Sequence, residues 1–254
     1  MKYLLTITTI LIGLAFLPKQ KETGKKIFLL MGQSNMAGRG KITAAFENLT
    51  DSRVLMLNAN NEFITAKHPI HFDKPKAVGV GPGLTFGMNM AKAYPKDSIY
   101  LIPCAVGGTS INKWEPEAFD KITNTHPYDD AVLRIKEAMK KGKIDGVIWL
   151  QGESDSNPKA AAVYLSKLVT LIERVRKETN NPELPFVVGE LGTFRKEFQL
   201  INSELHKLTT LVSFTKVVTS ENLSHKGDTT HFDAPSAAIY GDRFAKAMLE
   251  LMKK

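Results

Sequence analysis

A serine follows a short apolar run near the start of the chain. Residues 27–31 are Ile-Phe-Leu-Leu-Met, a length and composition typical of a strand buried on both faces. The next segment is Gly32-Gln33-Ser34-Asn35-Met36-Ala37-Gly38. Ligands bind outside the carboxyl ends of the strands in open α/β sheets, so Ser34 is a candidate nucleophile. A turn whose serine caps the next segment would give the same pattern.

A histidine and an aspartate near the other end of the chain have the types and spacing that would activate a serine. A serine hydroxyl needs an imidazole to take its proton, and the imidazole needs a carboxylate to fix its tautomer. Asp228 and His231 lie three residues apart before a helix and can turn toward each other. Such a pair also occurs often by chance. His225 is an alternative base or a surface histidine, and Asp233 is an alternative carboxylate or a helix cap.

Donors for a developing negative charge follow two further apolar runs. Gly107 and Gly108 can present backbone N–H groups with no side chain in the way, and Gln151 offers an amide N–H. Alternatively, the two glycines form a tight turn and Gln151 forms a hydrogen bond to a buried backbone group. Phosphate-binding motifs of the GxGxxG and GxxxxGK[ST] types are absent, which disfavours nucleotide binding. No further metal ligands occur at a suitable spacing from Glu153, so we expect no metal site. We interpret Glu153 as a residue that orients its neighbours in the site.

The segments between these residues alternate in pattern. Apolar runs predict strands over 27–31, 98–103, 145–150, 185–188 and 214–219. Amphipathic stretches predict helices over 84–94, 128–141, 157–177, 197–211 and 237–252. Two short runs, 53–57 and 62–65, flank an Asn-rich turn and predict a hairpin. Strictly alternating strands and helices predict a three-layer α/β/α sandwich around a mostly parallel sheet of about five strands.

Composition and charge describe a globular protein. The 254 residues are 43% hydrophobic and 24% charged, enough to bury a full core in a single domain. A formal charge of +8 would suit an acidic polymer, but the lysines are scattered, so we expect no nucleic-acid partner. The single cysteine, Cys104, excludes an intramolecular disulfide and a cysteine-based zinc site.

The first residues resemble a secretory signal peptide. Met1-Lys2 precedes an uncharged, largely apolar stretch over residues 3–17, and polar residues follow. We expect a signal peptide over 1–19, a single domain over 20–254, and a secreted or periplasmic location without stable membrane insertion. The apolar stretch is short of the about 20 residues that a membrane span needs, although an uncleaved anchor is the alternative.

Four segments together resemble the SGNH (GDSL-like) hydrolase superfamily, and more closely its carbohydrate acetylesterase branch, which holds the family 6 acetyl xylan esterases and the sialate O-acetylesterases. The segments, in the family's order, are Gly32–Gly38, residues 103–111 with Trp114, Trp149-Leu150-Gln151-Gly152-Glu153-Ser154-Asp155 and Asp228-Thr229-Thr230-His231-Phe232-Asp233. The resemblance spans about residues 26–251 and implies a flavodoxin-like SGNH fold.

The resemblance also implies roles for individual residues. Ser34 would be the nucleophile, His231 the base and Asp228 its orienting carboxylate. The oxyanion hole would comprise the backbone N–H groups of Ser34 and Gly108 and, as our own inference where the wider superfamily uses an asparagine, Gln151. The expected supporting residues are Gln33, Asn35, Gly107 and Glu153. Trp114 would either stack on a sugar ring or pack in the core.

The activity implied by the resemblance is a secreted serine esterase that removes O-acetyl groups from carbohydrate through an acyl-enzyme, with no cofactor. Acetylated oligo- or polysaccharide is the expected partner, with xylan as the leading example. A sialate O-acetylesterase would share the triad and differ in its pocket. A carbohydrate-binding relative without catalysis is the third alternative, and the presence of Ser34, Asp228 and His231 argues against it.

Overall fold

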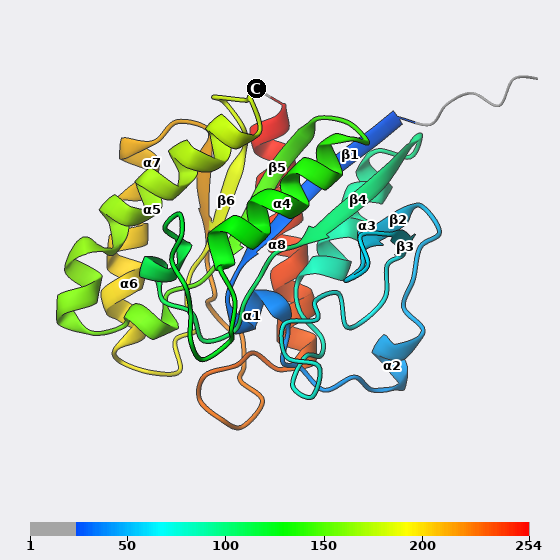
Figure 1. Cartoon of the computed structure of the whole chain (residues 1–254). Coiled ribbons are helices and arrows are strands. Elements are labelled where there is room, and N and C mark those ends of the chain that lie inside the picture. Colours follow the sequence, from blue (N-terminus) through cyan, green and yellow to red (C-terminus); the bar gives the residue numbers. More distant parts are fainter. Residues whose placement is uncertain (1–23, 254) are drawn as a thin grey trace, which may run out of the picture.

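The structure is a computed structural model that describes residues 24–253, so the expected signal peptide lies outside the described residues. One seven-stranded sheet runs through the molecule in the order β3-β2-β4-β1-β5-β6-β7 (Figure 1). The strands are β1 (Gly24–Gly32), β2 (Val54–Leu57), β3 (Phe63–Thr65), β4 (Asp97–Pro103), β5 (Ile144–Leu150), β6 (Phe186–Gly189) and β7 (Thr215–Val218). All neighbours pair in parallel except β2 and β3.

The α/β class with a mostly parallel sheet is confirmed, but the expected number of about five strands is wrong. The hairpin expected at 53–57 and 62–65 forms as β2 and β3, and it joins the sheet because β2 pairs in parallel with β4. The sequence did not indicate that the hairpin joins the central sheet, because neither of its short strands contains a long apolar run. Its outer strand, β3, is the one antiparallel edge.

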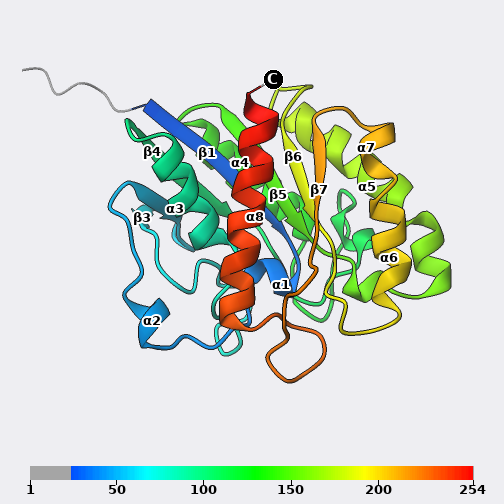
Figure 2. The same cartoon turned by 180° about the vertical axis from the view of Figure 1, so that it is seen from behind.

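Helices cover both faces of the sheet (Figures 1 and 2). One layer consists of α4 (Pro127–Met139), α5 (Pro158–Glu178), α6 (Phe198–Leu205) and α7 (Leu208–Leu211), and the other of α3 (Gly83–Ala93) and α8 (Ala234–Met252). Short helices in the connections are α1 (Ser34–Ala37), α2 (Ala44–Glu47), η1 (Ile111–Trp114) and η2 (Glu153–Asp155). No helix within residues 24–253 is long and apolar enough to cross a membrane.

The central strand β1 divides its side chains between two hydrophobic cores. Ile27, Leu29 and Met31 pack under the α4–α7 layer, whereas Phe28 and Leu30 pack under α3 and α8. All five side chains have no solvent exposure, as expected for a strand that is covered on both faces. The burial of β1 fixes the position at which its carboxyl end emerges.

The chain turns sharply at that end. Gly32 has φ of +136°, and a Cβ on it would lie 2.1 Å from the carbonyl oxygen of Leu150 on the neighbouring strand β5. Only glycine tolerates both the backbone conformation and this close approach. Ser34 therefore begins α1 immediately beyond the sheet, at the edge where β4, β5 and β7 also end (Figure 2).

Candidate active site

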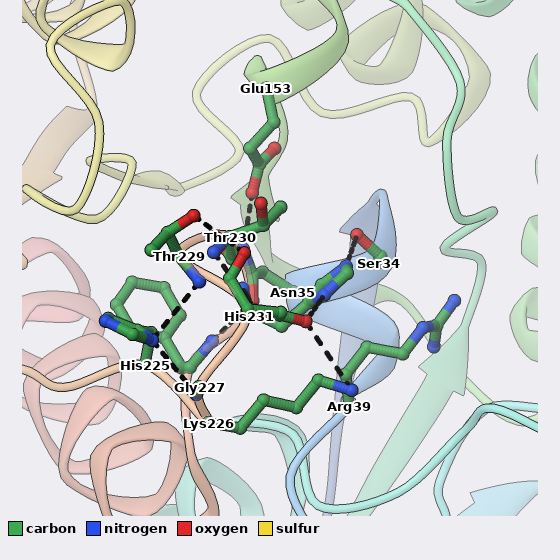
Figure 3. Close-up of polar contacts among 12 residues, drawn as sticks. Ser34, Asn35, Arg39, Glu153, His225, Lys226, Gly227, Thr229, Thr230 and His231 are labelled. Atoms are coloured by element: carbon green, nitrogen blue, oxygen red, sulfur yellow. Dashed lines mark hydrogen bonds and ion pairs between the residues drawn. The ribbon is translucent and has the colours of Figure 1, made fainter.

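Three side chains from opposite ends of the chain form one hydrogen-bonded line. His231 Nε2 lies 2.9 Å from Ser34 Oγ, and His231 Nδ1 lies 2.7 Å from Asp228 Oδ2. Figure 3 shows His231 reaching toward Ser34 from the loop that follows β7. This is the geometry of a serine whose proton an imidazole can accept while a carboxylate holds the imidazole in the required tautomer.

Local hydrogen bonds keep Asp228 ionised. Burial acts to raise its pKa, but the N–H and the ring of His231 and the N–H of Thr230 donate to its carboxylate and hold the pKa well below the usual range. The pKa of His231 is lowered from 6.5 by burial, against the opposing effect of Asp228. His231 is therefore neutral near pH 7, the state in which it can take a proton.

The two alternative partners have other roles. His225 Nδ1 accepts the N–H groups of Gly227 at 2.9 Å and Thr229 at 3.2 Å, so this nitrogen points into its own loop and not at Ser34 (Figure 3). Asp233 accepts the N–H of Ser236 at 2.8 Å and caps the first turn of α8. The structure thus brings only His231 and Asp228 to Ser34.

Asn35, expected to have a supporting role, connects three parts of the site. Its amide nitrogen donates to Glu153 Oε1 at 2.5 Å and to the carbonyl of Thr230 at 3.0 Å, and its oxygen accepts the N–H of Phe232 at 3.0 Å. Burial raises the pKa of Glu153 to about 7, with Asn35 opposing the shift. Asn35 and Glu153 thus fix the loop that contains His231 against α1 and the end of β5.

Ser34 and Gly108 both line the cleft, and each carries a backbone N–H. Among residues 24–253, no acceptor takes the N–H of Ser34 or of Gly108, which leaves both available to an oxyanion. Gly108 is exposed and has φ of +86°, a conformation that favours glycine. Gly107 is not a donor to the site, because its N–H bonds to Asp73 Oδ2 at 2.8 Å.

An ion pair that the sequence analysis missed holds the glycine turn. Arg39 and Asp73 form a buried pair at 2.7 Å, and Arg39 also donates to the carbonyl of Gly38. A Cβ on Gly107 would lie 2.3 Å from the Arg39 guanidinium and 2.8 Å from the Asp73 carboxylate. Asp73 lies in a Pro- and Gly-rich loop, where no periodic pattern could have indicated its partner.

The prediction that Gln151 completes the oxyanion hole is wrong. Gln151 has no solvent exposure, and its amide nitrogen donates to Asp155 Oδ2 at 2.6 Å, to the carbonyl of Thr109 at 2.9 Å and to Gln33 Oε1 at 3.2 Å. These interior acceptors take the hydrogen bonds of the Gln151 amide, so its N–H groups are not available to a substrate. Gln151 therefore supports the floor of the site from below and does not line the cleft, whereas Gln33, its partner, does.

Trp114 does not line the site either. It is 1% exposed, packs edge-on against Trp149 with ring centroids 5.0 Å apart, and donates its indole N–H to Thr109 Oγ1 at 3.3 Å. A side chain with no free face cannot stack on a sugar, so the core interpretation of Trp114 holds.

The cleft over Ser34 has a volume of ≈ 470 Å³, and its lining contains more basic than acidic residues. Its basic residues are Arg39, Lys74, Arg195 and Lys226. Lys74 Nζ lies 3.6 Å from the position of a Cβ on Gly108, so one positive charge stands next to a candidate oxyanion donor. Within the described residues, no group of three His, Cys, Asp or Glu side chains could hold a metal ion.

The fold defines the class of protein, an α/β protein with one mostly parallel sheet, and solved structures share it. NanS shares the fold with a TM-score of 0.72 at 18% identity, over 91% of this chain and 98% of that chain. A carbohydrate acetylesterase from Xanthomonas citri, XAC1771, shares it with a TM-score of 0.69 at 17% identity, over 90% of this chain and 56% of that chain.

The chain belongs to the SASA family, described as "carbohydrate esterase, sialic acid-specific acetylesterase", whose model matches residues 24–250. It is 31% identical over 243 residues to the probable carbohydrate esterase At4g34215 of Arabidopsis thaliana, covering 88% of this chain and 90% of that protein. The crystal structure of that protein superposes with a TM-score of 0.80, over 89% of this chain and 98% of that chain. The protein is thus a carboxylic ester hydrolase of the carbohydrate acetylesterase kind, which confirms the resemblance.

Proposed function

We propose that this carbohydrate acetylesterase works through an acyl-enzyme on Ser34, with His231 as general base and Asp228 as its orienting carboxylate. The observation that supports the proposal is the continuous line from Asp228 through His231 to Ser34 Oγ, with contacts of 2.7 and 2.9 Å. A carbohydrate-binding relative without catalysis would have no need to keep all three groups in line.

In this mechanism His231 Nε2 takes the proton of Ser34 as Oγ attacks the acetyl carbonyl. The N–H groups of Ser34 and Gly108 stabilise the negative charge that develops on the carbonyl oxygen. His231 then gives the proton to the sugar oxygen as its bond to the acetyl carbon breaks, so the sugar leaves as an alcohol and an acetyl ester stays on Ser34. Water, deprotonated by the same imidazole, attacks this ester, and the imidazole returns the proton to Ser34 Oγ as acetate leaves.

The sugar has two candidate classes. Acetylated polysaccharide, with xylan as the example, comes from the sequence resemblance. An O-acetylated sugar acid such as sialic acid is favoured by Lys74, a basic residue in the lining of the cleft that forms no ion pair within the described residues. The other three basic residues of the lining pair with acidic side chains: Arg39 with Asp73, Arg195 with Glu197 and Lys226 with Asp228. The position of Lys74 beside Gly108 would place a cation near a substrate carboxylate.

The test is acetate release from p-nitrophenyl acetate, acetylated xylan and O-acetylated sialic acid. We expect the wild type to cleave the aryl ester and one of the sugars, and Ser34→Ala to lose about 10³-fold or more in kcat while remaining folded. Ser166→Ala, at an exposed serine on α5, is the matched control and keeps full activity. Equal activity of wild type and Ser34→Ala would refute the nucleophile.

We further propose that the protein is exported, because residues 1–19 have the basic, apolar and then polar order of a signal peptide. N-terminal sequencing of the protein recovered from the extracellular or periplasmic fraction tests this. Recovery of the full-length chain from the cytoplasm alone would contradict export.

A further inference from the structure

The loop that carries Asp228 and His231 is exposed and has an unfavourable backbone. We call residues 225–233 the acid–base loop. Gly227 has φ of +110° and Thr229 has φ of +54°, and Asp228 and Thr229 are exposed to solvent. A non-glycine residue with positive φ is costly and persists only where surrounding interactions impose it. Something other than core packing must therefore hold Asp228 in place.

The imidazole of His225 bonds the chain on both sides of Asp228. Its Nδ1 accepts the N–H of Gly227 at 2.9 Å and the N–H of Thr229 at 3.2 Å, and these residues are the immediate neighbours of Asp228 (Figure 3). Both contacts require a lone pair on Nδ1, so the ring proton is on Nε2. One nitrogen thus holds the peptide unit that joins Asp228 to Thr229 and the unit that joins Lys226 to Gly227, one residue before Asp228.

The ring of His225 is itself anchored. It contacts the edge of Phe194 with centroids 5.1 Å apart, and Phe194 in turn packs on the buried Phe232 at 5.2 Å. A bridge between His225 and Phe232 and the bond from Lys226 N–H to the carbonyl of His231 at 2.9 Å close the base of the loop. The acceptor nitrogen therefore has a fixed position relative to His231.

We propose that His225 is a positioning residue for catalysis, whose Nδ1 lone pair holds the acid–base loop in the conformation that lets Asp228 reach His231. The inference rests on the proposed triad and extends it to a fourth side chain that touches neither substrate nor Ser34. The essential atom is Nδ1, a hydrogen-bond acceptor two bonds beyond Cβ. Neither the aromatic ring alone nor Nε2 can accept the N–H groups of Gly227 and Thr229 in its place.

Four variants separate the acceptor from the ring. His225→Asn places an oxygen the same number of bonds from Cβ as Nδ1, His225→Gln places it one bond further, His225→Phe keeps the ring without an acceptor, and His225→Ala removes both. We expect kcat on p-nitrophenyl acetate to fall roughly 10- to 100-fold for Ala, Phe and Gln, to stay within about threefold of wild type for Asn, and KM to change little.

Two controls and a second readout make the result decisive. His126→Ala, at another histidine outside the site, should leave kcat unchanged, and thermal unfolding identifies any variant that is not folded. The NMR signal of the His231 Nδ1–H proton, which is hydrogen-bonded to Asp228, should be lost in the Ala, Phe and Gln variants and kept in the Asn variant.

The two readouts distinguish the two proposals. An inactive wild type whose His231 proton signal is present, and is lost in His225→Ala, would refute the proposed mechanism and show only that His225 positions Asp228 against His231. Wild-type kcat together with an unchanged proton signal in folded His225→Ala would overturn the positioning role. A variant series in which Asn behaves like Phe would overturn it as well.

Discussion

Asn35 bonds the chain on both sides of His231. Its amide donates to the carbonyl of Thr230 and accepts the N–H of Phe232, each at 3.0 Å. The residue after Ser34 therefore fixes the residues before and after His231. The separation of 2.9 Å between Ser34 Oγ and His231 Nε2 depends on these two bonds as well as on the loop itself.

The pH dependence of the rate should follow His231. Burial lowers the pKa of this imidazole from 6.5, with Asp228 opposing the shift, and only the neutral ring can take a proton. We expect kcat/KM to rise with pH below about 6.5 and then level off. Asp228→Asn removes the charge that raises the pKa of His231, so its acid limb should move to lower pH, and the plateau should fall roughly 10²- to 10⁴-fold.

Hydrolysis of p-nitrophenyl acetate over a range of pH measures both effects. Ser166→Ala is the control with an unchanged profile. An acid limb that does not move in Asp228→Asn would show that this carboxylate does not act on the catalytic base.

Asp73→Ala should impair both stability and rate. It leaves Arg39 as a buried charge without a partner, a change that typically costs about 3 to 5 kcal/mol of unfolding free energy. It also frees the N–H of Gly107 and loosens the turn that carries Gly108, so we expect roughly a tenfold loss of kcat in the folded enzyme.

Urea unfolding and steady-state kinetics test this, with Glu137→Ala as the matched control. That substitution breaks an exposed pair with Lys140 and should cost less than about 1 kcal/mol. Similar unfolding free energies for the two variants would contradict a structural role for the Arg39–Asp73 pair.

Gln151→Leu should behave as a stability variant. It deprives the buried Asp155 carboxylate and the Thr109 carbonyl of a donor, so we expect the unfolding free energy to fall by about 1 to 3 kcal/mol. The kcat of the folded enzyme should change less than about tenfold, whereas loss of an oxyanion donor costs about 10² to 10³. A stable variant with a 10³-fold lower kcat would restore Gln151 to the oxyanion hole.

Stability should decrease below neutral pH because of two buried histidines. Burial lowers the pKa of His68 and of His71 from 6.5 to about 4, so the unfolded chain binds protons that the folded chain does not. The contribution of these two histidines to the unfolding free energy is complete above about pH 6.5, and it is lost as the pH falls toward 4. Each should contribute a loss of about 2 kcal/mol between about pH 6.5 and 5.

Urea unfolding of wild type and His68→Gln at both pH values isolates one of these contributions, because glutamine does not titrate. We expect the variant to lose about 2 kcal/mol less than wild type on acidification. The same acid sensitivity in both proteins would refute the assignment to His68.

The strand ends, and the proximity of Ser34, His231 and Asp228, could be predicted from the sequence because each of these residues lies in or next to a recognisable local pattern. The apolar run before Ser34 identifies β1, and the order of the four segments brings Asp228 and His231 to the same edge. The remaining errors concern orientation. Gln151 and Trp114 have suitable side chains near the edge, but acceptors and rings distant in sequence turn both inward. The Arg39–Asp73 pair joins a helix end to an irregular loop, and no periodicity predicts such a pair.

Ser34 and His231 are 197 residues apart, with the serine at the end of the first described strand and the histidine beyond the last. Contacts of such long sequence separation are formed late, since the entropy of closing the intervening chain must be lost first. Esterase activity should therefore return after the recovery of secondary structure during refolding. A chain that ends before β7 would lack His231 and should have no esterase activity, even if its earlier strands formed. Esterase activity is therefore a measure of complete folding.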